Sequence, residues 1–174
     1  MEICVHVATR LDRQTLSRLA ELYLYDFSDF MGWDIGDDGR FGDSILVGCW
    51  DEPWRHTFLI KVSGRLAGFA IVDERSHLSG SLTTVDMKEF FVLRKYRRRG
   101  VGDAAATHLF DRFPGRWEIR ELAKNTAAQA FWRKMVARYT NGCFVDTNWD
   151  DQQRGPVQSF NTLDRAKQEQ HGEE

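Results

Sequence analysis

The amino-acid sequence predicts a mixed α/β fold built on one central sheet with helices on both sides. Short apolar runs of strand-like composition alternate along the chain with stretches of helical periodicity, in the order β-α-β-β-β-α-β-α-β-β. The 174 residues, 42% hydrophobic and 29% charged, suffice for one core. We therefore predict a single domain over residues 1–162 and a charged, flexible tail at 163–174.

The first third of the chain predicts one strand and one long helix. Residues 2–8 alternate apolar with more polar side chains, which is typical of a strand. A helix begins near Asp12, and its apolar residues fall on one face: Leu16, Leu19, Ala20, Tyr23, Phe27 and Phe30. Residues 32–42 are rich in glycine and aspartate and predict a loop, whereas the pattern of residues 45–54 favours neither a helix nor a strand.

The middle of the chain predicts a hairpin and a central strand. Residues 57–62 and 66–72 are two strands joined by a glycine-containing turn. Gly68 within the second strand indicates a bulge or a close backbone approach. A polar loop at 75–81 then leads to a strand that ends with the apolar run Phe90–Leu93.

The last third predicts two helices and three strands. A helix follows Gly102 and ends before Pro114-Gly115, and a short strand covers 117–122. A second helix begins at Asn125 or Thr126 and ends at Asn141-Gly142, with Ala128, Phe131, Trp132, Met135 and Tyr139 on its apolar face. Residues 143–149 and 156–160 are the closing strands around a polar loop at 150–155.

Composition excludes several classes of function. No apolar run approaches the roughly 20 residues of a membrane span, and the N-terminus lacks the features of a signal peptide. Cys4, Cys49 and Cys143 form no C-x-x-C pair, so we expect reduced thiols and a cytoplasmic protein. The five histidines show no metal-ligand spacing, so no metal is expected. A net charge of −2 argues against general nucleic-acid binding.

A glycine turn between a strand and a helix predicts an anion site. The basic run Arg94–Arg99 leads into Gly100-Val101-Gly102, where the next helix begins. Glycines let the backbone approach a ligand, and the first helical amides are unpaired donors at the positive end of the dipole. The alternatives are a tight turn without a ligand or a solvated basic patch. The spacing fits neither the dinucleotide fingerprint nor the nucleoside-triphosphate P-loop.

The spacing Arg97-x-x-Gly100-x-Gly102 resembles the R/Q-x-x-G-x-G/A pyrophosphate loop of the GNAT superfamily of acyl-CoA N-acyltransferases. Val92 stands five residues earlier, where that family ends its central strand with a small apolar residue. Asn125-x-x-Ala128-x-x-Phe131-Trp132 is similar to the family's N-x-x-A-x-x-[LF]-[YW] segment. The match covers residues 56–138, and it implies the GNAT fold with a mixed, mostly antiparallel sheet flanked by helices on both faces.

The resemblance implies that acetyl-CoA is the acyl donor. Backbone amides near Gly100 would hold the pyrophosphate, and the strand residues before the turn would pair with the pantetheine arm. For Asn125, a simple helix cap is the alternative to ligand contact. The residues implied for cofactor binding are Phe91, Val92, Leu93, Arg97, Arg98, Arg99, Gly100, Val101, Gly102, Asn125, Phe131 and Trp132.

Catalytic residues are less sharply defined. Asp86 stands eleven residues before Arg97, where some GNAT enzymes have a glutamate base, and Glu89 follows three residues later among apolar neighbours. Either carboxylate could instead lie at the surface or pair with Arg94 or Lys88. Trp132 stands where many members have a tyrosine acid, and indole cannot donate a proton at useful pH. Tyr139 or solvent would then protonate the thiolate, although core packing is the alternative role of Tyr139.

The acceptor site is implied for the segment after the first strand. Acidic and aromatic residues there suit a cationic amine, and those we single out are Tyr23, Asp26, Phe27, Phe30 and Trp33. The alternative for the aspartates is a solvated loop. The predicted function is acetyl-CoA-dependent N-acetyl transfer by direct attack of a primary amine, with a homodimer left open. Two rivals are a non-catalytic acyl-CoA-binding sensor and a nucleic-acid binder that uses the basic run.

Overall fold

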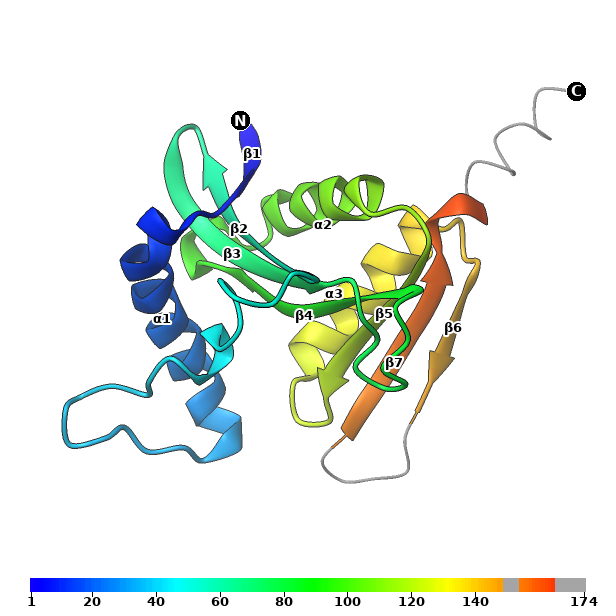
Figure 1. Ribbon diagram of the computed structural model, residues 1–174. Coiled ribbons are helices and arrows are strands. Elements are labelled where there is room, and N and C mark those ends of the chain that lie inside the picture. Colours follow the sequence, from blue (N-terminus) through cyan, green and yellow to red (C-terminus); the bar gives the residue numbers. More distant parts are fainter. Residues whose placement is uncertain (149–153, 165–174) are drawn as a thin grey trace, which may run out of the picture. The chain divides into compact units, whose positions relative to one another are not determined.

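A computed structural model describes residues 1–148 and 154–164 of the chain (Figure 1). Within these residues the α-helices are α1 (Arg13–Met31), α2 (Val101–Arg112) and α3 (Thr126–Tyr139). The strands are β1 (Ile3–Val7), β2 (Arg55–Val62), β3 (Arg65–Asp73), β4 (Thr84–Val92), β5 (Arg116–Leu122), β6 (Phe144–Thr147) and β7 (Arg154–Asn161). Short 3-10 turns occupy Arg10–Asp12, Ser44–Leu46 and Arg94–Tyr96.

The predicted order of elements and the predicted fold class are confirmed. The sheet has the order β1-β2-β3-β4-β5-β7-β6; the ladders β1–β2, β5–β7 and β6–β7 are antiparallel, and β4–β5 is parallel. The unassigned residues 45–54 contain a 3-10 turn instead of a strand or a longer helix. The end of the strand predicted at 143–149, most of the loop at 150–155 and most of the tail at 163–174 lie outside the described residues.

The chain forms two compact units. The first consists of residues 1–72 and 89–105, and the second of residues 73–88 together with the described residues from 106 onward. Both β4 and α2 therefore contribute residues to each unit.

In the first unit, the buried side chains of β2, β3 and β4 form two clusters, each packed against a different helix. Leu59, Phe69, Ile71 and Phe91 join the buried face of α1, which contributes Leu16, Leu19, Ala20, Tyr23 and Leu24. Ile60, Val62, Ala67 and Val92 instead pack with Val101 and Ala105 from the first turns of α2. Helices therefore cover both faces of β2, β3 and β4, as the amphipathic pattern of α1 predicts.

An aromatic cluster forms the core of the second unit. The ring of Phe110 on α2 lies 4.8 Å from Trp117, 5.0 Å from Tyr139 and 5.0 Å from Phe160 between ring centroids. Trp132 of α3 is only 5% exposed and adds a further ring 6.4 Å from Phe110. These ring contacts fix α2 and α3 against β5 and β7.

Gly68 allows a close approach of two strand backbones, as the sequence predicts. A Cβ atom at this position would lie 1.9 Å from the carbonyl oxygen of Phe91 on β4. We expect Gly68→Ala to lower the free energy of unfolding by about 2–3 kcal/mol, because β4 must move to accept the methyl group. Chemical denaturation measures this change.

Gly64→Ala in the adjacent turn is the control for Gly68→Ala. Nothing lies within 4 Å of a Cβ atom at Gly64, and only its φ of 76° opposes a side chain. It should cost about 1 kcal/mol, the ordinary penalty of a left-handed residue. Equal costs at the two sites would contradict the steric argument.

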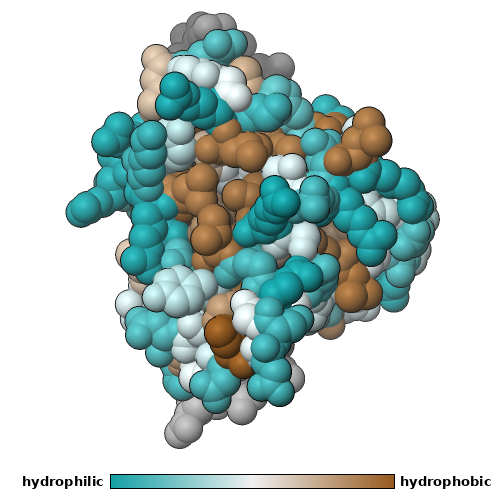
Figure 2. All heavy atoms as spheres, turned by 90° about the vertical axis from the view of Figure 1, so that its left-hand side faces the viewer, coloured by the Kyte–Doolittle hydropathy of each residue, from teal (hydrophilic) through white to brown (hydrophobic). Residues whose placement is uncertain are grey.

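Apolar side chains reach the surface in places. Figure 2 shows one face of the molecule, on which hydrophobic atoms form patches between hydrophilic ones. Large hydrophobic residues that are exposed include Leu11 at 94%, Val47 at 71% and Tyr25 at 62% exposure. In the described part of the chain, α-helices lack the length and hydrophobicity that crossing a bilayer requires.

Candidate functional site

The glycine turn forms a cradle of backbone amides. After the 3-10 turn at Arg94–Tyr96, Arg98 adopts the left-handed conformation with φ of 57°, Gly100 follows with φ of 76°, and α2 begins at Val101. Among the described residues, the backbone N–H groups of residues 98–102 donate no hydrogen bond of good geometry to another backbone group. Such consecutive free amides at a helix N-terminus bind anions. The loop thus has the geometry that a pyrophosphate requires.

Two arginines of the basic run are bound to helix α1. Arg94 donates from Nε and Nη2 to Asp26 Oδ1, at 3.0 and 2.7 Å, and Arg97 forms an ion pair with Asp26 Oδ2. Arg97 Nε also donates to the carbonyl oxygen of Val92 at 2.7 Å. The guanidinium groups of Arg94 and Arg97 are thus committed to Asp26, while Arg98 and Arg99 are exposed beside the free amides.

The sequence predicts that Asp26 contributes to the acceptor site, but in the structure its carboxylate binds two arginines. Its side chain is 16% exposed, and its negative charge is balanced by two guanidinium groups. In this structure Asp26 therefore holds the turn at residues 94–100 to α1, a connection between residues 68 and 71 positions apart that the sequence gives no sign of.

Glu89 on β4 is bound to Tyr23 on α1. The Tyr23 hydroxyl donates to Glu89 Oε2 at 2.6 Å. The tyrosine ring is 8% exposed and lies 4.3 Å from Phe27, 5.7 Å from Phe69 and 5.6 Å from Phe91 between centroids. Glu89 itself is half-buried. One of the two candidate bases thus lies in an aromatic environment, next to residues predicted for the acceptor site.

The other predicted aromatic residues of the acceptor site continue this cluster. Phe27 lies 5.0 Å from Phe30 and is stacked on Trp33 at 6.5 Å with an interplanar angle of 18°. Gly32 ends α1 with φ of 70°, which turns the chain so that Trp33 comes back onto the helix. Trp33 is 43% exposed. Tyr23, Phe27, Phe30 and Trp33 therefore form a continuous row of rings from the core to the surface.

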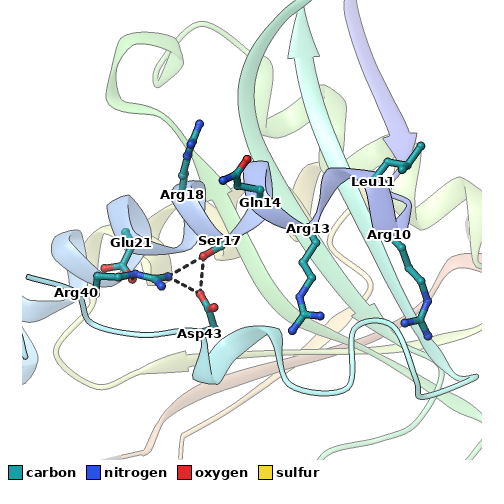
Figure 3. A pocket seen from close by; sticks show the side chains of 9 residues that line it. All are labelled: Arg10, Leu11, Arg13, Gln14, Ser17, Arg18, Glu21, Arg40 and Asp43. Atoms are coloured by element: carbon teal, nitrogen blue, oxygen red, sulfur yellow. Dashed lines mark hydrogen bonds and ion pairs between the residues drawn. The ribbon is translucent and has the colours of Figure 1, made fainter. Parts of the chain in front are cut away.

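The loop after α1 is anchored by charged groups. Glu21 accepts hydrogen bonds from the backbone of Phe41 and Gly42, at 2.8 and 3.1 Å, and from Arg40 Nε at 3.1 Å. Figure 3 shows Arg40 directed at Ser17 and Asp43, beside a surface hollow of about 660 Å³ along the first half of α1. The predicted acceptor residues do not line this hollow.

Asp86, the other candidate base, is part of a buried ion pair in the second unit. It is 1% exposed, and Arg120 on β5 binds both of its oxygens, at 3.1 and 2.9 Å. Burial raises the pKa of Asp86, and Arg120 opposes this rise. The sequence offered Arg94 or Lys88 as the partner of a structural carboxylate, and this is wrong for Asp86: Arg120 has that position because β4 and β5 pair at Asp86 and Glu118.

Residues of α3 have structural roles in addition to any role in binding. Asn125 caps the helix, since its Oδ1 accepts from the backbone amide of Ala128 at 3.1 Å. Trp132 is buried against Phe131 at 4.9 Å. The Tyr139 hydroxyl donates to Asp111 at 2.8 Å, and its ring is 8% exposed. This binding and burial of Tyr139 favour core packing over proton donation.

The ladder between β4 and β5 is short. It pairs Thr84 with Arg116, Val85 with Trp117 and Asp86 with Glu118, and the later residues of β4 take no part in it. On the other side, β4 neighbours β3, and Leu93 donates its amide to Ala67 at 2.8 Å. Backbone groups in the second half of β4 are therefore not used by the β5 ladder.

A buried glutamate that the sequence did not single out lies on β5. Glu121 is 7% exposed, and neither carboxyl oxygen accepts a hydrogen bond with correct geometry from a described residue. Burial raises its pKa to about 8, although Gln158 and Arg133 partly oppose this rise. Strand alternation was a usable signal, because Trp117, Ile119 and Glu121 share one face and the first two are core residues.

The family model of the acetyltransferase (GNAT) family matches residues 16–136, which is more than half of the chain. The chain belongs to the GNAT family. Membership makes this protein an acyltransferase of the N-acetyltransferase type, whose members use acetyl-CoA. A search of curated proteins gives no match.

Solved structures with the same fold are distant in sequence. The ribosomal-protein-S18-alanine N-acetyltransferase from Escherichia coli is 16% identical, with a TM-score of 0.61 and coverage of 92% of this chain and 94% of that one. An acetyltransferase from Thermus thermophilus is 15% identical, with a TM-score of 0.66 and coverage of 92% and 97%. The spermidine N-acetyltransferase from Vibrio cholerae, solved with CoA and spermine, is 8% identical, with a TM-score of 0.65 and coverage of 94% and 98%. These likenesses establish the fold of the GNAT protein.

Proposed function

We propose that this GNAT protein transfers an acetyl group from acetyl-CoA to a small cationic primary amine. The row of free backbone amides at residues 98–102 carries the proposal, because it forms an anion cradle at the start of a helix. Arg98 and Arg99 are exposed on the same turn and add positive charge.

Further residues would hold the rest of the donor. The backbone of Phe91, Val92 and Leu93 precedes the cradle and takes no part in the β4–β5 ladder, so we assign it to the pantetheine arm. Asn125, Phe131 and Trp132, the other residues predicted for cofactor binding, lie on α3 or at its N-cap in the second unit, and the proposed donor site uses residues of the first unit. Arg97 would act mainly through its backbone, since its side chain binds Asp26 and Val92.

Glu89 is the carboxylate that we assign as the base. Asp86 is buried and its charge is neutralised by Arg120, whereas Glu89 is half-buried beside the aromatic row. The rings of Phe27, Phe30 and Trp33 suit a cationic acceptor because aromatic faces attract ammonium groups. The spermidine N-acetyltransferase with the same fold supports a polyamine as the first acceptor to test.

The proposed reaction needs few protein groups. Acetyl-CoA, when bound, supplies a thioester that an uncharged amine attacks directly. Glu89 accepts one proton from the ammonium group, which produces the attacking amine. Trp132 cannot donate a proton and Tyr139 is bound to Asp111, so we assign protonation of the departing thiolate to solvent. The second proton lost by nitrogen leaves to water.

Calorimetric titration with acetyl-CoA tests the donor site. Gly100→Glu should abolish binding that the unaltered protein shows, because it puts bulk and negative charge in the cradle. Gly39→Glu is the matched control: Gly39 and Gly100 have φ of 74° and 76°, and nothing lies within 4 Å of a Cβ atom at either. Equal affinity of both variants for acetyl-CoA would exclude the cradle as the pyrophosphate site.

A second candidate function is acyl-CoA binding without catalysis, as in a sensor or a partner-binding subunit. This function is favoured by two observations. Trp132 stands where many family members have a tyrosine that donates a proton, and the Tyr139 hydroxyl is hydrogen-bonded to Asp111. Binding of acetyl-CoA without acetylation of any member of an amine panel would support this function.

We further propose a cytoplasmic location, which suits Cys4, Cys49 and Cys143 because these three cysteines form no disulfide.

A further inference from the structure

We propose that Tyr23 is a positioning residue for Glu89, which it keeps ionised and in one orientation. The inference rests on the proposed function, which makes Glu89 the group that accepts the proton of the amine. Tyr23 would act through Glu89 and need not touch the substrate.

The hydrogen bond itself is of the strong type. The distance from the Tyr23 hydroxyl to Glu89 Oε2 is 2.6 Å, within the range of O–H donors bound to ionised oxygen. A donor of this kind stabilises the carboxylate more than the neutral acid. Removing it should therefore make Glu89 take up a proton at higher pH.

The hydroxyl is held in place by its surroundings. The ring of Tyr23 packs against Phe27 on its own helix, Phe69 on β3 and Phe91 on β4. With 8% exposure, the ring cannot turn its hydroxyl to bulk solvent without breaking these contacts. The phenol therefore fixes both the position and the charge state of the carboxylate.

The elements around this hydrogen bond carry further charged and apolar residues. Asp26 follows Tyr23 by three residues on α1, and it binds Arg94 and Arg97 from the turn after β4. On β3 the residue that packs against Tyr23 is the apolar Phe69. Lys88 precedes Glu89 on β4, and strand alternation directs it to the opposite face. Removal of the Tyr23 hydroxyl is therefore expected to change the stabilisation of Glu89 directly.

The test is a carboxyl-carbon NMR titration of protein labelled at glutamate, with Glu89→Gln used to assign the Glu89 signal. In Tyr23→Phe the midpoint for Glu89 should move to higher pH by about one unit, because a hydrogen bond to a charged group is lost while the ring contacts remain. Tyr25→Phe, on the same helix at a residue 62% exposed, should leave the midpoint unchanged. Tyr23→Met, which also lacks the hydroxyl, is measured alongside.

An unchanged or lowered Glu89 midpoint in folded Tyr23→Phe or Tyr23→Met would overturn the inference. The titration needs neither acetyl-CoA nor an acceptor, so its result is separate from calorimetry on the donor site. With an active amine, Tyr23→Phe should lower kcat by up to about tenfold at pH values below the original midpoint, and the deficit should disappear well above the new one. A weaker affinity for acetyl-CoA, or an equal loss of kcat at every pH, would indicate a structural role and contradict the proposal.

Discussion

Replacing Glu89 by glutamine is expected to lower the rate constant of acetyl transfer by a factor of about 10²–10⁴, the usual contribution of a positioned base. Glutamine keeps the size of the side chain and can still accept a hydrogen bond from Tyr23, but it cannot take a proton from an ammonium group. Steady-state kinetics with acetyl-CoA and a polyamine measure the change. The affinity for acetyl-CoA should stay as it is, because Glu89 lies outside the amide cradle.

Asp86→Asn separates the two candidate carboxylates. It removes the charge opposite Arg120 in a buried pair, so its main effect should be on stability. A full rate in Glu89→Gln, combined with a large loss in correctly folded Asp86→Asn, would assign the base to Asp86 and refute our choice.

Glu121→Gln is expected to stabilise the protein in alkaline solution. Burial raises the pKa of Glu121 from 4.5 to about 8, so the folded protein keeps a proton that the unfolded chain loses. Stability is therefore lost as the pH rises from about 4.5 to about 8, and the full penalty remains above that range. At roughly 1.4 kcal/mol for each pH unit the upper limit is about 5 kcal/mol, and structural relaxation leaves an expected gain of about 2–4 kcal/mol for glutamine at pH 8.5.

Glu118→Gln is the matched control for Glu121→Gln. Both glutamates are buried on β5, at 5% and 7% exposure, but Glu118 accepts hydrogen bonds from Ser76 Oγ and from the amides of His77 and Leu78. Its replacement should destabilise the protein because these donors lose a charged acceptor. Denaturant unfolding at pH 5 and pH 8.5 measures both variants. If Glu121→Gln gains no stability between the two pH values, the glutamate is not protonated in the fold.

Periodicity was sufficient to predict the elements of this fold. Long amphipathic stretches such as α1 and the apolar run that ends β4 have distinct spacings, and both were predicted within a few residues. Residues 45–54 could not be assigned, because a 3-10 turn is too short to produce a period. Gly68 was interpretable because a glycine inside a strand usually marks a bulge or a close approach of another backbone.

The candidate site was only partly predictable. Local features such as the glycine cradle and the Asn125 cap follow from residues close in sequence. Partners far apart in the chain do not: Asp26 and Arg97 are separated by 71 positions, and Asp86 and Arg120 by 34. The sequence does not indicate which of several arginines a given carboxylate binds. The partners of Asp26 and Asp86 are instead determined by the packing of α1 and by the register of the strands.

The ion pairs of Asp26 with Arg94 and Arg97 limit which segments of this protein can be exchanged with those of relatives. The segment that we assign to the acceptor and the loop that we assign to the donor share one charge cluster. A chimera that imports a foreign helix α1 without an acidic residue at this position would leave two cations facing each other. New acceptor specificity would thus be easier to graft onto the aromatic row beyond Asp26 than by replacing the whole helix.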